Sequence, residues 1–116
     1  MNPRLSLSRV IIFTGRLEEM VIFYSEVIGL ELASREQGWV ELGAGGCTIA
    51  LHEWHGEAAE GPLKIVFQTD EVAAARALLV SRGAPMGEVV SFGEIDLCDG
   101  TDTDGNAFQL SNRVTP

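Results

Sequence analysis

The sequence has little positive charge and no long apolar run, and each shortage excludes a class of protein. Eight Lys and Arg residues stand against 17 Asp and Glu, for a formal net charge of −9. This balance argues against nucleic-acid binding, which needs a basic surface. No apolar run approaches the roughly 18 residues of a membrane span. The residues after Met1 also lack the apolar core of a signal peptide. We therefore expect a cytoplasmic protein that binds neither nucleic acid nor membrane.

Cysteine is also scarce, because Cys47 and Cys98 are the only two among 116 residues. Two cysteines in a domain of this size indicate reduced packing residues, not a disulfide framework. The length fits a single domain, residues 1–116, which is large enough to bury a core without covalent support. The acidic excess would attract cationic ligands, although solubility alone would also explain it.

What the chain does contain is a repeat of about half its length. An apolar run at 10–15 leads into a helical pattern that ends at Gly29, and residues 64–70 lead likewise into one that ends at Gly83. Each half then continues with three strand-like runs. This repeat predicts two strand–helix–three-strand modules, at about residues 5–55 and 63–113. It also predicts a binding cup between the modules, where equivalent positions converge.

Hydrophobic spacing places the elements within each module. Apolar residues recur at helical spacing over 17–28, where Gly29 can close the helix, and over 71–82, between Asp70 and Gly83. Alternating or short apolar runs predict strands at 30–34, 39–42, 47–54, 88–92, 94–98 and 107–111. Residues 57–62 are the only linker-like stretch. The Asp102–Gly105 segment resembles a calcium loop, but Gly100 and Ser111 stand where oxygen ligands would be needed, so we expect a tight turn.

These features resemble the vicinal oxygen chelate superfamily, which includes glyoxalases, extradiol dioxygenases and bleomycin resistance proteins. Arg9-Val10-Ile11-Ile12-Phe13, with Phe23-Tyr24 and Val27-Ile28-Gly29-Leu30, is similar to the opening strand and helix of that family. The 64–70 segment resembles its second opening strand. Residues 102–110 resemble its Asp-Pro-Asp-Gly-Asn turn and last strand, with Thr103 in place of proline. The resemblance implies an α+β fold of two βαβββ modules with cupped mixed sheets, and a homodimer.

The resemblance also implies four metal-ligand positions, which fall on Arg9, Ala50, Lys64 and Gln109. Ala50 has no ligand atom, and the cationic Arg9 and Lys64 repel a divalent metal. Gln109 alone cannot hold a transition metal. We therefore expect no metal, no cofactor and no catalytic residue of the family's usual kind. The closest type within the family is then a metal-free, bleomycin-resistance-like member.

Strand alternation predicts which side chains share the inner face of the cup. The predicted ligand-binding residues are Arg9, Phe13, Trp39, Glu41, His52, Lys64, Asp96 and Gln109. Two interpretations stay open. The two cations could pair with Glu41 and Asp96 and plug the former metal site, or the polar groups could hold an organic ligand, with Phe13, Trp39 and Trp54 as stacking surface. The charge of such a ligand is left undetermined.

Other chemistry has weaker support in the sequence. His52 and His55 are three residues apart at a strand end, a spacing that does not direct both rings to one side. Neither cysteine has an activating neighbour, and no nucleophile motif is present. The leading hypothesis is metal-independent binding of a small organic molecule, such as sequestration of an antibiotic or toxic metabolite. The alternatives are a metal-dependent lyase or dioxygenase with non-standard ligands, and a structural or regulatory dimer.

Overall fold

The structure is a computed structural model that describes residue 4 and residues 6–56 and 63–114. The chain divides into two compact units, residues 1–58 and 59–116, and each is described by itself. The predicted linker at 57–62 lies outside the described residues. None of the helices in the described part is long and apolar enough to cross a membrane.

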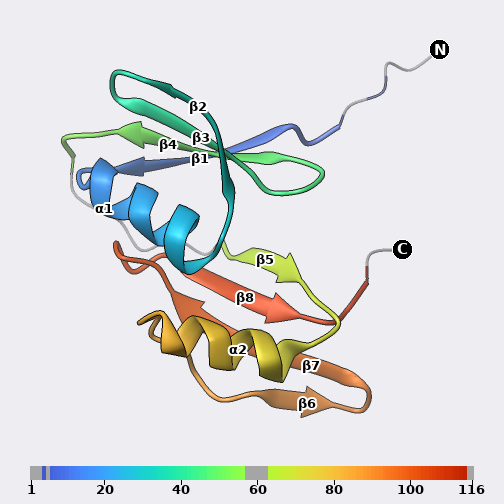
Figure 1. Cartoon of the computed structure of the whole chain (residues 1–116). Helices are drawn as coiled ribbons and strands as arrows, with labels where there is room; N and C mark the ends of the chain where they lie inside the picture. Colours follow the sequence, from blue (N-terminus) through green and yellow to red (C-terminus); the bar gives the residue numbers. More distant parts are fainter. Residues whose placement is uncertain (1–3, 5, 57–62, 115–116) are drawn as a thin grey trace. The chain divides into compact units, whose positions relative to one another are not determined.

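The first unit is a four-stranded mixed sheet with one helix (Figure 1). Its strands are β1 (Arg9–Thr14), β2 (Glu31–Glu36), β3 (Trp39–Gly43) and β4 (Thr48–Glu53). They lie in the order β1-β4-β3-β2, in which β1 and β4 are parallel and the other neighbours antiparallel. The parallel pair is possible because the connection from β1 to β4, which contains the helix, β2 and β3, is longer than the dozen residues that a parallel crossover needs.

The helix predicted at 17–28 consists of α1 (Leu17–Ile22), which continues as one π-helical turn, η1 (Phe23–Val27). The backbone N–H of Ile28 donates to the carbonyl oxygen of Phe23 at 2.9 Å, the wider spacing of a π turn. Gly29 then adopts a φ of 94°, which ends the helix as predicted.

The core of the first unit lies between this helix and one face of its sheet. The fully buried side chains are Met20 and Tyr24 from the helix, and Val40, Leu42, Ile49 and Leu51 from the two central strands. Strand register pairs Val40 with Leu51 and Leu42 with Ile49, so these four share one face. Alternation leaves the other face of the sheet without helix cover.

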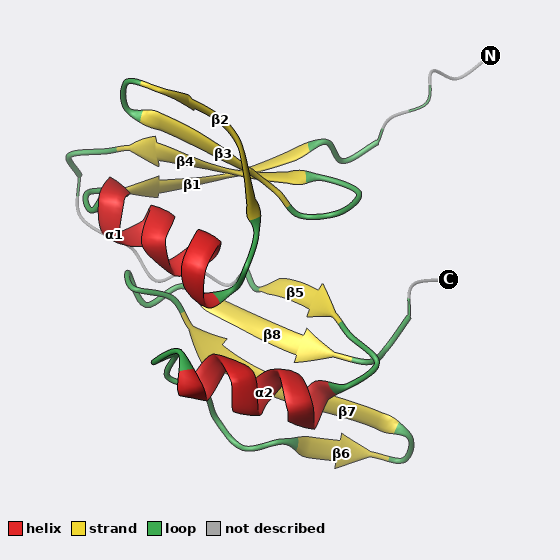
Figure 2. Cartoon of the chain, viewed as in Figure 1, coloured by secondary structure: helices red, strands yellow, loops and turns green. Residues whose placement is uncertain are grey.

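The second unit repeats this plan (Figure 2). It contains β5 (Ile65–Gln68), α2 (Val72–Ser81), β6 (Val90–Phe92), β7 (Ile95–Thr101) and β8 (Ala107–Ser111). Its strand order is β5-β8-β7-β6, with β5 and β8 parallel. The predicted α+β class and the repeated strand–helix–three-strand module are therefore confirmed. Single-domain behaviour of residues 1–116 stays a prediction.

Two local predictions in the second unit can be compared with the structure. β7 extends to Thr101, three residues beyond the predicted 94–98 strand, because pairing with β8 continues through Gly100 and Phe108. The turn predicted at 102–105 is confirmed, since a carboxylate oxygen of the buried Asp102 accepts hydrogen bonds from the N–H groups of Asp104 and Asn106, both at 2.9 Å. Cys98 is buried in the core, and both cysteines are free thiols.

Candidate ligand-binding face

Strand register in the first unit brings five of the predicted site residues to one face of the sheet. Phe13 of β1 and Trp39 of β3 both pair with His52 of β4, the strand that lies between them. Arg9 pairs with Thr48, and Glu41 pairs with Ala50, at the next positions along the same face. Partners in register point to the same side of a sheet, so the predicted alternation that puts these five residues on one face is confirmed.

The aromatic groups on this face form a continuous row of contacts. The guanidinium of Arg9 lies over the Trp39 ring, 5.7 Å from its centroid. Centroid distances are 5.6 Å from Trp39 to His52, 5.4 Å from His52 to Phe13 and 5.8 Å from Phe13 to Trp54. All four are within the range of favourable aromatic or cation–π contacts. We call the five residues Arg9, Phe13, Trp39, His52 and Trp54 the aromatic face.

Much of this row is open to solvent. Phe13 is 55% exposed and Trp54 49%, and the neighbouring Ile11 is 43% exposed. Side chains of this size normally contribute to the core, since burying a Phe stabilises a fold by about 1.5–3 kcal/mol. A contiguous exposed aromatic patch is typical of a surface that binds a ligand or another macromolecule.

Glu41 of β3 binds one residue on each of the other two strands of this face, Arg9 of β1 and Thr48 of β4. Its Oε2 accepts hydrogen bonds from Thr48 Oγ1 at 2.6 Å and from Arg9 Nε at 3.1 Å. These two bonds, the Thr48 hydroxyl first, lower the pKa of Glu41 below its ordinary value. The carboxylate of Glu41 therefore balances the positive charge of Arg9 at its end of the aromatic face.

The second unit holds Lys64 and Gln109 in a similar polar cluster around Asp99. Oδ1 of Asp99 accepts a hydrogen bond from Gln109 Nε2 at 2.9 Å and one from Lys64 Nζ at 3.1 Å. The hydrogen bond from the Gln109 amide is the largest effect on the pKa of Asp99 and lowers it; burial opposes this, and the Lys64 ammonium lowers the pKa further. Asp99 pairs with Gln109 in the β7–β8 register, as Glu41 pairs with Ala50 in the first unit.

The prediction that Asp96 shares a face with Gln109 is wrong. Asp96 pairs with Ser91 and accepts a hydrogen bond from its hydroxyl at 2.6 Å. Alternation along β7 puts Asp96 on the same side as the buried Cys98, whereas Asp99 shares a face with Gln109. Glu41 lies nine residues before Ala50, whereas Asp99 lies ten residues before Gln109, so the spacing of the first unit would have pointed to Gly100 and not to Asp99.

The two ion pairs do not form a buried plug. The side chains of Arg9 and Glu41 are 45% and 14% exposed, and those of Lys64 and Asp99 are 40% and 61% exposed. A pair as exposed as Lys64–Asp99 contributes about 0–1 kcal/mol. Each ion pair therefore has at least one side chain in contact with solvent.

The metal positions implied by the family do not fit a metal in this chain. Arg9 and Lys64 are cations that already bind carboxylates, and Ala50 is fully buried without a donor atom. Within residues 4, 6–56 and 63–114, no three His, Cys, Asp or Glu side chains gather closely enough to hold a metal ion. His52 instead takes part in the aromatic row through Phe13 and Trp39.

The lowered pKa values predict how stability depends on pH. The unfolded chain binds protons at Glu41 and Asp99 at a higher pH than the folded protein does, so the free energy of unfolding rises with pH through this window. The stabilisation is present above about pH 5 and is lost as the pH falls through 4 and below. Urea unfolding of wild type and of the Glu41→Gln/Asp99→Asn variant between pH 3 and 6 measures it. The variant should show the shallower slope, and equal slopes would contradict the prediction.

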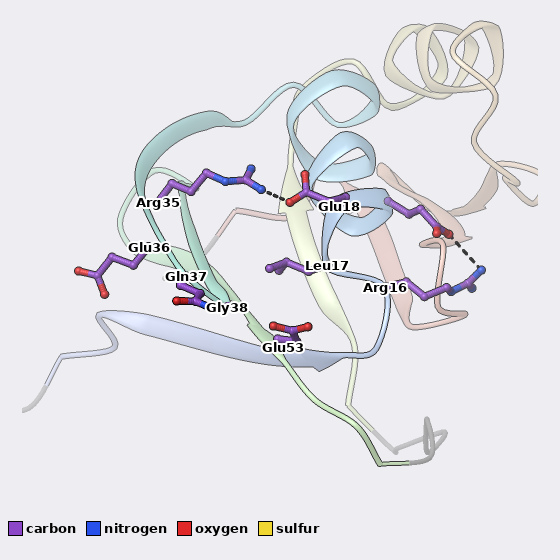
Figure 3. A pocket seen from close by; sticks show the side chains of 9 residues that line it. Arg16, Leu17, Glu18, Arg35, Glu36, Gln37, Gly38 and Glu53 are labelled. Carbon is purple, nitrogen blue, oxygen red and sulfur yellow. Dashed lines mark hydrogen bonds and ion pairs between the residues drawn. The ribbon is translucent and has the colours of Figure 1, made fainter.

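A charged groove of about 650 Å³ lies elsewhere on the first unit, between the start of α1 and the β2–β3 turn (Figure 3). It contains the Arg35–Glu18 ion pair and an Arg16–Glu19 pair of 3.3 Å. Leu17 is the one apolar side chain among the described residues that line it. A pocket for an organic molecule needs mostly apolar walls, so the aromatic face is the better candidate.

Comparison with known proteins agrees with the fold. Among solved structures, an antibiotic-binding protein from Streptomyces is 21% identical, with a TM-score of 0.82 over 95% of this chain and 97% of that chain. A lactoylglutathione lyase from Agrobacterium tumefaciens is 16% identical, with a TM-score of 0.77 over 95% of each chain. Likenesses at these identities show the fold alone.

No curated protein sequence matches this chain significantly. The ligand-binding roles of the predicted residues, the homodimer and the cytoplasmic location stay predictions. The family model of the glyoxalase/bleomycin resistance protein/dioxygenase superfamily matches residues 6–110, and the chain belongs to that superfamily.

Proposed function

We propose that this protein binds a small organic molecule with a planar ring system on the aromatic face, without a metal. The observation that carries the proposal is the unbroken row of contacts from Arg9 through Trp39, His52 and Phe13 to Trp54 on an exposed sheet face. A planar ligand would cover the exposed ring surface, and each aromatic contact would add about 0.5–1.5 kcal/mol beyond the burial of apolar area.

Polar groups at one end of the row would orient such a ligand. Arg9 uses Nε to bind Glu41, and a guanidinium has further N–H donors for an oxygen of the ligand. The hydroxyl of Thr48 is committed to Glu41 at 2.6 Å. Because Glu41 matches the charge of Arg9, we propose that ring stacking supplies most of the affinity and that the charge of the ligand contributes less.

The role that follows is sequestration of an antibiotic or a toxic metabolite. An antibiotic-binding protein of the same fold supports this choice. The donor set argues against the lyase or dioxygenase alternative, because Arg9, Ala50 and Lys64 occupy three of the four positions where the family's enzymes need metal ligands.

A titration of ¹⁵N-labelled protein with three naphthalenes tests the proposal. The probes are 2-naphthol, 2-naphthalenesulfonate and 2-naphthylmethylamine, which share a planar ring and differ in charge. We expect saturable shifts of the indole N–H signals of Trp39 and Trp54 and of the amide of Phe13. The ranking of the three affinities shows which ligand charge the aromatic face prefers. Absence of saturable shifts with all three, or shifts confined to α2, would overturn the proposal.

Metal independence is tested separately. Protein purified without chelators should contain no stoichiometric zinc, iron, nickel or manganese, and EDTA should leave its Tm unchanged, since the donor set described above cannot hold a metal. Elemental analysis and thermal unfolding with and without EDTA provide the measurement. A stoichiometric metal whose removal lowers the Tm would contradict the prediction and favour an enzyme with non-standard ligands.

A further inference from the structure

Trp54 forms one end of the aromatic face although it lies beyond the last residue of β4. Its backbone is held in place, because its N–H donates to the carbonyl oxygen of Thr14 at 2.8 Å and so continues the pairing of β4 with β1. With the backbone held at this point, rotation about the side-chain torsions is the direct way to move the indole. On one side this ring meets Phe13 edge to face, with centroids 5.8 Å apart.

On its other side the indole lies directly against Gly56. A Cβ atom added to Gly56 would stand 2.6 Å from Cζ2 of Trp54, and closer still to its Nε1 and Cε2. Such contacts are too short to exist, so any side chain at position 56 would occupy the space of the indole. Gly56 does not have a positive φ, so its backbone conformation alone does not require glycine.

We propose that Gly56 is a positioning residue for ligand binding: its lack of a side chain lets the Trp54 indole lie against the backbone and keeps the ring at the edge of Phe13. This inference rests on the proposed function of the aromatic face. It predicts that Gly56→Ala turns the indole away from Phe13 and shortens the aromatic row by one ring. The sheet itself should be unaffected, because position 56 lies outside it.

The first test needs no ligand. In the wild-type protein, NOEs should connect the rings of Trp54 and Phe13, and ring current should shift one Hα of Gly56 upfield. Gly56→Ala should abolish the NOEs, and Trp54→Ala should abolish the upfield shift. Gly46→Ala is the matched control, because an added Cβ at Gly46 meets nothing within 4 Å. Ring NOEs that persist in Gly56→Ala would overturn the positioning role.

The second test measures affinity for 2-naphthol in the full chain. Gly56→Ala should weaken binding roughly 2- to 10-fold, the scale of one aromatic contact, and Gly46→Ala should not. In a Trp54→Ala background, Gly56→Ala should not weaken the binding of 2-naphthol further, because the indole that Gly56 positions is absent. A further loss there would overturn the inference. If the NOEs behave as expected but none of the three naphthalenes binds, the proposed function fails and the control of the indole by Gly56 stands.

Discussion

Phe13→Ala is expected to weaken the binding of a planar aromatic ligand by about 1–3 kcal/mol, roughly 5- to 150-fold in Kd. Phe13 is an interior ring of the row, because it contacts both His52 and Trp54. It is also 55% exposed, so its truncation removes ligand-facing surface and little core. Titration calorimetry with the tightest-binding naphthalene measures the loss, and urea unfolding checks that the fold is retained.

Two variants show whether the ring of Phe13 is responsible. Leu78→Ala truncates a comparably exposed apolar side chain on α2, at 49% exposure, and should leave affinity unchanged. Phe13→Leu keeps apolar bulk but removes the ring, so it should recover only part of the lost affinity. Equal affinities for wild type and Phe13→Ala would mean that the ligand does not use this face.

Phe108→Ala is expected to destabilise the protein by about 3–5 kcal/mol. Phe108 is fully buried in β8 and meets Phe67 edge to face, with ring centroids 6.0 Å apart. Its removal leaves a cavity in the core of the second unit, at a cost that is a large part of the 5–15 kcal/mol typical of a domain. Urea unfolding gives the change in free energy.

The surroundings of Phe108 allow a sharper test of the same core. A Cβ added to Gly100 would lie 2.5 Å from Sδ of Met86 and 2.8 Å from Cζ of Phe108, so Gly100→Ala should cost about 1–3 kcal/mol through overpacking against both side chains. Leucine at position 108 has no Cζ. The double variant Gly100→Ala/Phe108→Leu should therefore cost less than the sum of its two single changes. Strict additivity would show that the two positions do not share packing space.

Local chemistry made most of the fold predictable from sequence. Gly29 and Gly83 both adopt positive φ at the ends of their helices, and the helical and strand periods change at the boundaries that the repeat indicates. These signals depend on neighbours a few residues apart, so they can be read without the tertiary structure. The same holds for the inner face of β1, β3 and β4, where alternation is regular.

Asp96 shows where this reasoning failed. Whether Asp96 or Asp99 shares a face with Gln109 depends on how β7 pairs with β8, and a shift of one residue reverses every side chain. The sequence predicted Asp96 as the acid, on a strand expected to span residues 94–98. Pairing with β8 extends the strand to Thr101 and places Asp99 against Gln109 and Lys64.

The sequence by itself determined the repeated module, the loss of the family's metal ligands at Arg9, Ala50 and Lys64, and the acidic surface, because each is a property of residue type and spacing. Only the tertiary structure decided which acid each cation binds, that these pairs reach solvent, and that the Trp54 indole rests on Gly56. Those features depend on strand register and side-chain packing between residues distant in sequence. A pattern of neighbouring residues specifies neither this pairing of strands nor this packing of side chains.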